Sequence, residues 1–103
     1  MTRSNAESKE TIDIETSGGG VTLTLTGRTI VSLAIRGDGT ATYQVDARTR
    51  GGSWIQSVSS EYSGSADYDD VLETGATEMR IRCSTGTGTV GDQATITLMA
   101  GGG

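Results

Sequence analysis

Regular alternation of apolar residues with threonine is the feature of this sequence that most constrains its fold. The run 21–25 alternates valine or leucine with threonine, and the run 94–98 alternates alanine, isoleucine or leucine with threonine. Residues two apart on an extended chain point to the same side, so each run predicts a strand with one buried face and one polar face. Threonine, being β-branched, fits the half-exposed surface of such a strand. The chain is therefore expected to be all-β.

The same period recurs along the chain, between clusters of glycine. Further alternating runs lie at residues 31–35, 41–47 and 79–83, and weaker strands are expected at 11–15, 54–58 and 68–72. Gly37-Asp38-Gly39 separates two alternating runs and predicts a hairpin between them. About eight strands spaced roughly ten residues apart predict a single antiparallel β-sandwich or jelly roll.

The length of 103 residues fits one domain. Residues 1–10 are polar and are expected to form an arm, residues 11–100 the sandwich, and residues 101–103 a flexible glycine tail. The sequence contains no stretch of about 18 apolar residues, so we expect no membrane span. The N-terminus lacks the apolar region of a secretory signal, so we expect no such signal there.

The core is expected to combine the apolar positions of the strands with the two aromatic residues that lie in or beside them. Cys83 continues an apolar face and is interpreted as a small buried hydrophobe, not as a nucleophile, because the sequence has no histidine to activate it. The predicted core is Val21, Leu23, Leu25, Val31, Leu33, Ile35, Tyr43, Val45, Trp54, Met79, Ile81, Cys83, Ile96 and Leu98.

Composition excludes several classes of function. The absence of histidine removes the commonest general base and metal ligand, and a single cysteine removes a disulfide framework. A net charge of -5 argues against nucleic-acid binding. We therefore expect no enzymatic activity and no cofactor. Asp67, Asp69 and Asp70 offer oxygen ligands for a cation, but a solvated acidic strand edge is the simpler interpretation.

Two sets of polar side chains are candidates for contacts with a partner. Threonine faces are neither strongly apolar nor charged, so they could pack between subunits or serve as ordinary solvent faces. Tyr62 and Tyr68 lie in polar surroundings and could stack on sugar rings or contact another subunit. The interface candidates are Thr22, Thr24, Thr26, Thr95, Thr97, Tyr62 and Tyr68.

The choice of charged residues suggests a salty environment. The chain is acidic, and Lys9 is the single lysine among its eight basic residues. Multimolar salt strengthens apolar burial and screens repulsion between like charges, so a thin core with excess carboxylates is tolerable there. We interpret the composition as halophilic.

Two segments resemble a known family. The segment from Tyr43 to Trp54 resembles the strand, glycine turn and tryptophan hairpin of small β-sandwich proteins on tailed-virus particles, and the segment from Ala76 to Val90 resembles their closing hairpin. Together with the composition, the resemblance implies a head decoration or stabilisation protein of a haloarchaeal tailed virus. It implies repeated copies, in the form of trimers, bound to the capsid lattice at the virion surface after synthesis in the host cytoplasm. The alternative is a glycan- or host-surface-binding module of a viral spike, turret or tail.

Overall fold

The computed structural model describes residues 6–56 and 61–101, and these residues form a β structure without helices. In this part of the chain no helix is long and apolar enough to cross a membrane. The strands are β1 (Ala6–Asp13), β2 (Gly20–Thr24), β3 (Ile30–Gly37), β4 (Thr42–Arg48), β5 (Asp67–Glu73), β6 (Glu78–Thr85) and β7 (Gln93–Gly101).

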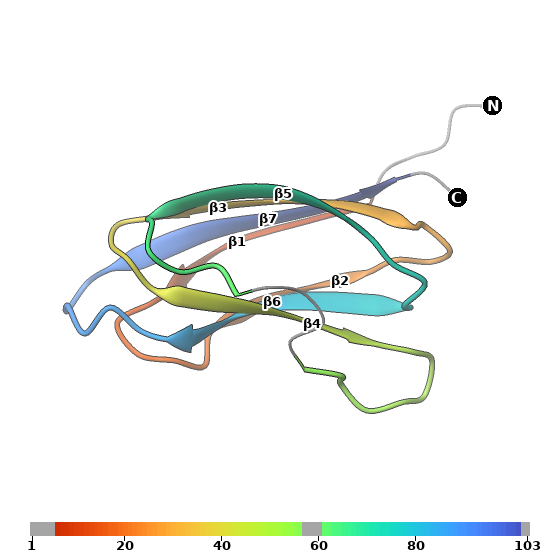
Figure 1. The fold of residues 1–103 in the computed structure, drawn as a ribbon, viewed down its shortest axis with the longest axis horizontal. Coiled ribbons are helices and arrows are strands. Elements are labelled where there is room, and N and C mark those ends of the chain that lie inside the picture. The colour runs from red at the N-terminus through yellow and green to blue at the C-terminus, as the bar shows by residue number, and fades with distance from the viewer. Residues whose placement is uncertain (1–5, 57–60, 102–103) are drawn as a thin grey trace.

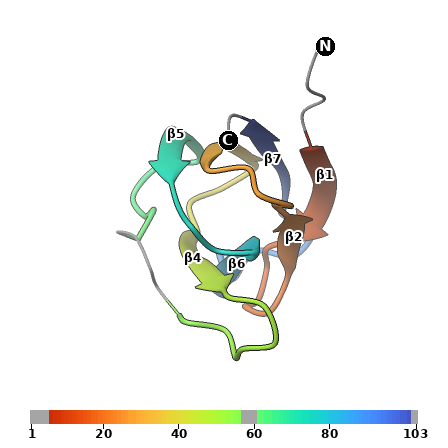
Figure 2. The same cartoon turned by 90° about the vertical axis from the view of Figure 1, so that its right-hand side faces the viewer.

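The strands form two antiparallel sheets that pack face to face. One sheet has the order β1-β7-β3-β5 and the other the order β2-β6-β4. Figure 1 shows the two layers one above the other, and Figure 2 shows them from the end. The expected all-β antiparallel sandwich is confirmed, with seven strands in the described residues where the sequence predicted about eight.

Among the seven described strands, those that follow one another in the sequence do not pair. The odd-numbered strands form one sheet and the even-numbered strands the other, so every connection crosses between layers. The hairpin predicted at Gly37-Asp38-Gly39 is therefore wrong. The Gly37 amide donates to Ala66 and the Asp38 amide donates to the Gln93 carbonyl, which anchors this turn to distant segments. The segment 76–90 contains β6 and the start of the connection that crosses to β7 in the other sheet, so it does not form a closing hairpin.

The glycine turns did not predict strand pairing correctly because a reversal of chain direction has two outcomes. The chain can return beside the strand it has left, or it can pass to the opposite layer. Both outcomes need residues that tolerate tight turns, so the local sequence does not distinguish them.

The N-terminal boundary also differs from the prediction. Residues 1–10 were expected to form a polar arm, but β1 begins at Ala6 and pairs along its whole length with β7. Its backbone hydrogen bonds complete the sheet, while its side chains remain mostly exposed. At the other end Gly101 closes β7, and residues 1–5 and 102–103 lie outside the described residues.

The core lies between the two sheets and is built from the inward side chains of both. All residues predicted for the core are buried except Trp54. The side chains of Tyr43, Ile35, Ile81 and Leu98 are among the largest that are fully enclosed. Ile14 and four alanines complete the buried hydrophobic set, and the predicted core did not include them.

Trp54 is the error in the predicted core. It is half-buried and lies after the glycine turn that follows β4. The return segment makes a single bridge to β4, in which the amide and carbonyl of Ile55 pair with those of Ala47. A minimal form of the hairpin predicted between Tyr43 and Trp54 is thus present, but the strand expected at 54–58 is not formed at Trp54–Gln56. Residues 57 and 58 lie outside the described part.

Candidate functional site

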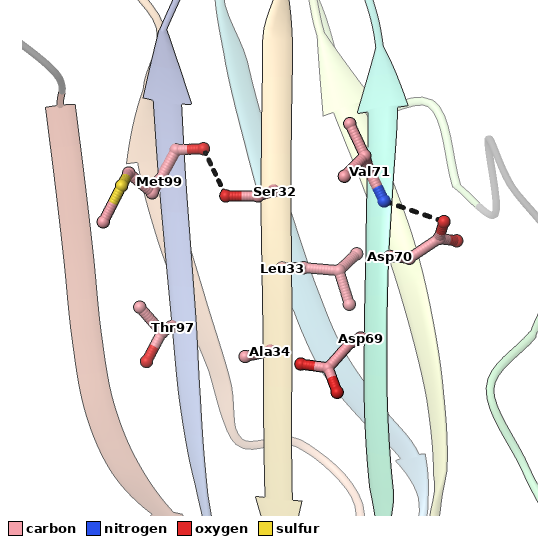
Figure 3. Close-up of a pocket in the computed structure, with 8 residues that line it drawn as sticks. All are labelled: Ser32, Leu33, Ala34, Asp69, Asp70, Val71, Thr97 and Met99. Atoms are coloured by element: carbon pink, nitrogen blue, oxygen red, sulfur yellow. Dashed lines mark hydrogen bonds between the residues drawn. The ribbon is translucent and has the colours of Figure 1, made fainter.

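The outer face of the sheet β1-β7-β3-β5 carries a shallow groove of about 620 Å³. We call this surface the groove face. Its lining is formed by β3, β5 and β7, whose outward side chains are small, aliphatic or acidic (Figure 3). The lining residues are Ser32, Leu33, Ala34, Asp69, Asp70, Val71, Thr97 and Met99, of which Leu33 belongs to the core and Asp70 faces the other side of β5.

Apolar side chains are exposed at one end of the groove face. Val71 is 64% exposed and Ile30 is 45% exposed, and Met99 is half-buried beside them. The strand register places Ser32 between Val71 and Met99, with Ile30 two residues before Ser32 on β3. Exposed large aliphatic groups that gather in this way mark surfaces for contact with another molecule.

Carboxylates border this apolar patch along β5. Asp67, Asp69 and Glu73 occupy alternate positions with Val71 and therefore share its outward face. The guanidinium of Arg36 binds both carboxylate oxygens of Asp69, at 2.8 and 3.0 Å. The pair is exposed, so its contribution to stability is small. The groove face is therefore apolar in part and acidic at the β5 edge.

The cation site considered for Asp67, Asp69 and Asp70 is not assembled. Successive residues of a strand point to opposite sides, so the side chain of Asp70 lies on the other side of β5 from those of Asp67 and Asp69. Its carboxylate accepts a hydrogen bond from the Tyr62 hydroxyl at 2.6 Å. Across the described ranges, no three histidine, cysteine or acidic residues are grouped to hold a metal ion.

The outer face of the sheet β2-β6-β4 has the opposite character, and it is centred on a buried carboxylate. Asp46 on β4 is fully enclosed. It accepts hydrogen bonds from the Nε atoms of Arg80 and Arg82 at 2.7 and 2.6 Å. Arg82 also donates to the side-chain oxygen of Gln44. A buried charge is tolerated only when it is paired and hydrogen-bonded, and these two arginines on β6 meet that requirement.

Trp54 covers this network from outside. The guanidinium carbons of Arg48 and Arg80 lie 4.7 and 4.3 Å from its ring centroid, in cation–π geometry. Arg48 also pairs with Glu78. Figures 1 and 2 both show the segment that carries Trp54 projecting away from the second sheet. Ile55 on this segment is 58% exposed.

We call this surface the loop face and define it by Arg48, Arg50, Trp54, Ile55 and Arg80. A second groove of about 510 Å³ lies beside it, lined in part by Arg48 and Arg50. With the neighbouring Arg82, this face carries four arginines, whereas its carboxylates are those of Asp46 and Glu78. It is thus positively charged in a chain whose net charge is -5.

The tyrosines form a cluster where β5 approaches the edge of β4. The Tyr68 ring lies 6.3 Å from Tyr43 and 5.4 Å from Tyr62, in edge-on contacts. The amide and carbonyl of Tyr62 pair with those of Tyr43, which covers part of the β4 edge. Tyr62 and Tyr68 therefore pack against the core instead of standing free as sugar platforms.

Two buried groups in the core have altered acidity. Burial raises the pKa of Tyr43 to about 12, with smaller contributions from Cys83 and Tyr68. The Tyr43 hydroxyl makes no hydrogen bond within the described residues. Burial also raises the pKa of the Cys83 thiol, and its sulfur lies 3.4 Å from the Thr85 carbonyl. A thiol held in the protonated form is a poor nucleophile, which fits a core role for Cys83.

The structure divides the threonine candidates between two opposite surfaces. Thr22 and Thr24 lie on β2, outside the second sheet and opposite Arg80 and Glu78. Thr26 follows β2 with a φ of 49° and borders the second groove. The remaining two lie outside the first sheet on β7. They are Thr95, which bonds the Thr11 hydroxyl at 2.9 Å, and Thr97, which lines the first groove.

Sequence reasoning missed the arginine cluster and the apolar patch. The alternation of arginine with apolar residues at 79–83 was visible, and it showed that Arg80 and Arg82 face outward. Their common acceptor on β4 was not predictable, because it depends on which strand lies next to β6 and in which register. Val71 lies within the weak strand expected at 68–72 and Ile30 lies just before the run 31–35, so the pattern marked neither as part of a surface patch.

Comparison with known proteins finds no matching family model and no matching curated sequence. Among solved structures, the SPBc2 prophage-derived protein YomS is similar with a TM-score of 0.68 at 10% identity, over 98% of both chains. A family 29 carbohydrate-binding module, CBM29-2, gives 0.52 at 12% identity, over 80% of this chain and 61% of the module. The module CpGH89CBM32-6 from Clostridium perfringens gives 0.55 at 15% identity, over 92% of this chain and 76% of that one.

At such low identity these likenesses define the fold alone. The chain has the small β-sandwich fold found in a prophage-derived protein and in carbohydrate-binding modules, and it spans about three fifths of the CBM29-2 chain. A fold of this kind serves structural and binding roles, so the role must be argued from the surface.

Proposed function

We propose that this chain is a non-enzymatic structural protein of a tailed-virus particle, of the head decoration or stabilisation type. In this role it adds copies of one rigid β-sandwich to a protein lattice. Its mechanism is burial of surface summed over many symmetric copies, and it needs no chemical step. The end-to-end likeness to the prophage-derived YomS fold supports this context.

The observation that carries the proposal is the use made of the aromatic side chains. The chain has four of them. Tyr43 is buried, Tyr62 and Tyr68 pack edge to face, and Trp54 is half-buried against two guanidinium groups. Sugar-binding surfaces need open aromatic faces for stacking, whereas the groove face presents aliphatic and acidic groups. Such a surface suits contact with another protein.

Binding to particles tests the proposal directly. The purified chain is mixed with particles of the parent virus made without it, and bound protein is measured after sedimentation. Saturable binding at a fixed number of copies per particle is expected. Val71→Lys should reduce binding, whereas Val90→Lys introduces the same charge at a loop residue that is 83% exposed and should not. Particles that bind none of the chain at any concentration would overturn the proposal.

A glycan-binding role is the second candidate, and it is favoured by the shared fold with carbohydrate-binding modules. Its test is titration of the purified chain with polysaccharide isolated from the host surface, followed by the fluorescence of Trp54. Saturable binding that is lost in a Tyr62→Ala chain whose circular dichroism shows a retained fold would support this role. Unchanged emission together with no heat of binding would remove it.

A further inference from the structure

The two outer faces of the sandwich are complementary in charge, shape and exposed apolar groups. The groove face is hollowed and carries Asp67 and Glu73 beside its apolar patch, together with Asp69, which is paired with Arg36. The loop face projects and carries arginines around Trp54. Since the two faces belong to opposite sheets, one copy cannot join its own faces, but two copies can.

We propose that the loop face of one copy docks in the groove face of the next copy. This inference deepens the proposed function and rests on it, because it names how neighbouring copies would touch. In the contact Ile55 meets the apolar patch of Ile30, Val71 and Met99. The guanidinium of Arg50 approaches the carboxylates along β5.

Exposed residues on both sides support a second copy as the occupant. Large hydrophobic side chains are exposed at four described positions, and two of them, Ile30 and Val71, lie on the groove face. A third, Ile55, lies on the loop face. Apolar groups at the centre of a contact with charges around them are the usual arrangement of an interface. Opposite potentials on the two faces would also fix their relative orientation.

A contact between two different faces has a geometric consequence. It is heterologous, so each copy keeps one free face after the first contact is made. Successive copies then close into a ring if the rotation between them allows it, or they continue as a filament. Both products differ from a dimer with a twofold axis, in which the same patch is used twice.

Solution mass of the purified full chain tests the contact without any virus particle. Light scattering after size exclusion is measured over a range of concentrations up to millimolar. The wild type should form a closed ring or longer assemblies. Val71→Lys blocks the groove face and Arg50→Glu blocks the loop face, and each should weaken self-association about tenfold or more. Val90→Lys is the matched control, and it should assemble like the wild type.

Mixing the two blocked variants provides the decisive measurement. The Val71→Lys chain keeps an intact loop face, and the Arg50→Glu chain keeps an intact groove face. The mixture should therefore form a heterodimer of equal parts and nothing larger, at concentrations at which each variant alone is monomeric. Circular dichroism of each variant checks that its fold is retained.

Several results would overturn this inference without touching the proposed function. One is a wild-type chain that stays monomeric at all concentrations but binds particles, since its faces would then serve the lattice partner. Another is assembly that both blocked variants leave unchanged. A mixture that yields no heterodimer would show that the loop face of one copy does not dock in the groove face of the other. Assembly in solution without particle binding would instead contradict the proposed function and leave this contact standing.

Discussion

The buried carboxylate of Asp46 gives the sharpest prediction from this structure. Its side chain is 0% exposed and receives two short hydrogen bonds from arginines on β6. Asp46→Asn keeps nearly the same shape but removes the negative charge. Arg80 and Arg82 would then lie side by side without the group that neutralises them. Both Nε atoms donate to the same oxygen, Oδ2, so the amide offers both arginines a neutral acceptor, or a donor if its nitrogen takes that place.

The expected magnitude follows from these contacts. Hydrogen bonds to charged groups contribute about 1.5–3 kcal/mol each, so two of them set an upper range of about 3–6 kcal/mol. The side chains of Arg80 and Arg82 are 27% and 25% exposed, and water can replace part of what they lose. We expect a loss of about 3 kcal/mol, at the low end for breaking a buried ion pair. For a domain of this size the melting temperature should fall by about 12–24 °C.

Thermal and urea unfolding, followed by circular dichroism, measure this change. Asp69→Asn is the matched control, because Asp69 also binds an arginine through two hydrogen bonds but its side chain is 69% exposed. It should cost about 0–1 kcal/mol. Adding Arg82→Gln to Asp46→Asn should recover part of the loss, because neighbouring changes are not additive. If Asp46→Asn matched the control in stability, the reasoning from burial would be refuted.

Three further changes test other parts of the fold by the same unfolding assays. Trp54→Ala should cost about 1–2 kcal/mol, since its ring stacks on arginines outside the core; a loss of about 3–5 kcal/mol would indicate a core residue. Tyr43→Phe removes a buried hydroxyl without a partner and should stabilise by about 1 kcal/mol. The pKa of Tyr43 is raised in the folded state, so between pH 10 and about 12 only the unfolded chain loses the proton of this hydroxyl. The free energy of unfolding of the wild type should therefore fall across this range, and it should fall less in Tyr43→Phe. Equal pH dependence in the two proteins would contradict this prediction. Gly86→Ala should cost about 2–3 kcal/mol, since the new methyl group would overlap the backbone at Glu15. Gly75→Ala, in open space, should change stability by less than about 1 kcal/mol, and equal effects of the two would contradict the predicted overlap.

The candidate site shows where prediction from sequence stops. The outward direction of Arg80 and the inward direction of Ile81 follow from their neighbours on one strand. The partnership of Arg80 with Asp46 does not, because 34 residues separate them and the pairing of β4 with β6 brings them together. The burial of Asp46 depends on side chains from a different strand, so no local pattern marks it.

Trp54 was misplaced for a related reason. A large aromatic residue in a chain with few others is expected to be buried, and its neighbours gave no contrary signal. The chain after the glycine turn returns beside β4 for one bridge only. The ring therefore rests on the outward side chains of Arg48 and Arg80, and these come together only when β4 and β6 are adjacent.

The sequence alone determined that this chain is all-β and which side of most strands is buried. Those properties follow from the alternation of side-chain direction along a strand. This alternation is local, so it can be read from the sequence without knowing which strands are adjacent. Only the tertiary structure decided that every connection crosses between sheets, that residues 6–10 belong to β1, and that the two outer faces differ in charge. The reason is that glycine turns permit a reversal without selecting the sheet that receives the next strand, and each outer face is assembled from strands far apart in the chain.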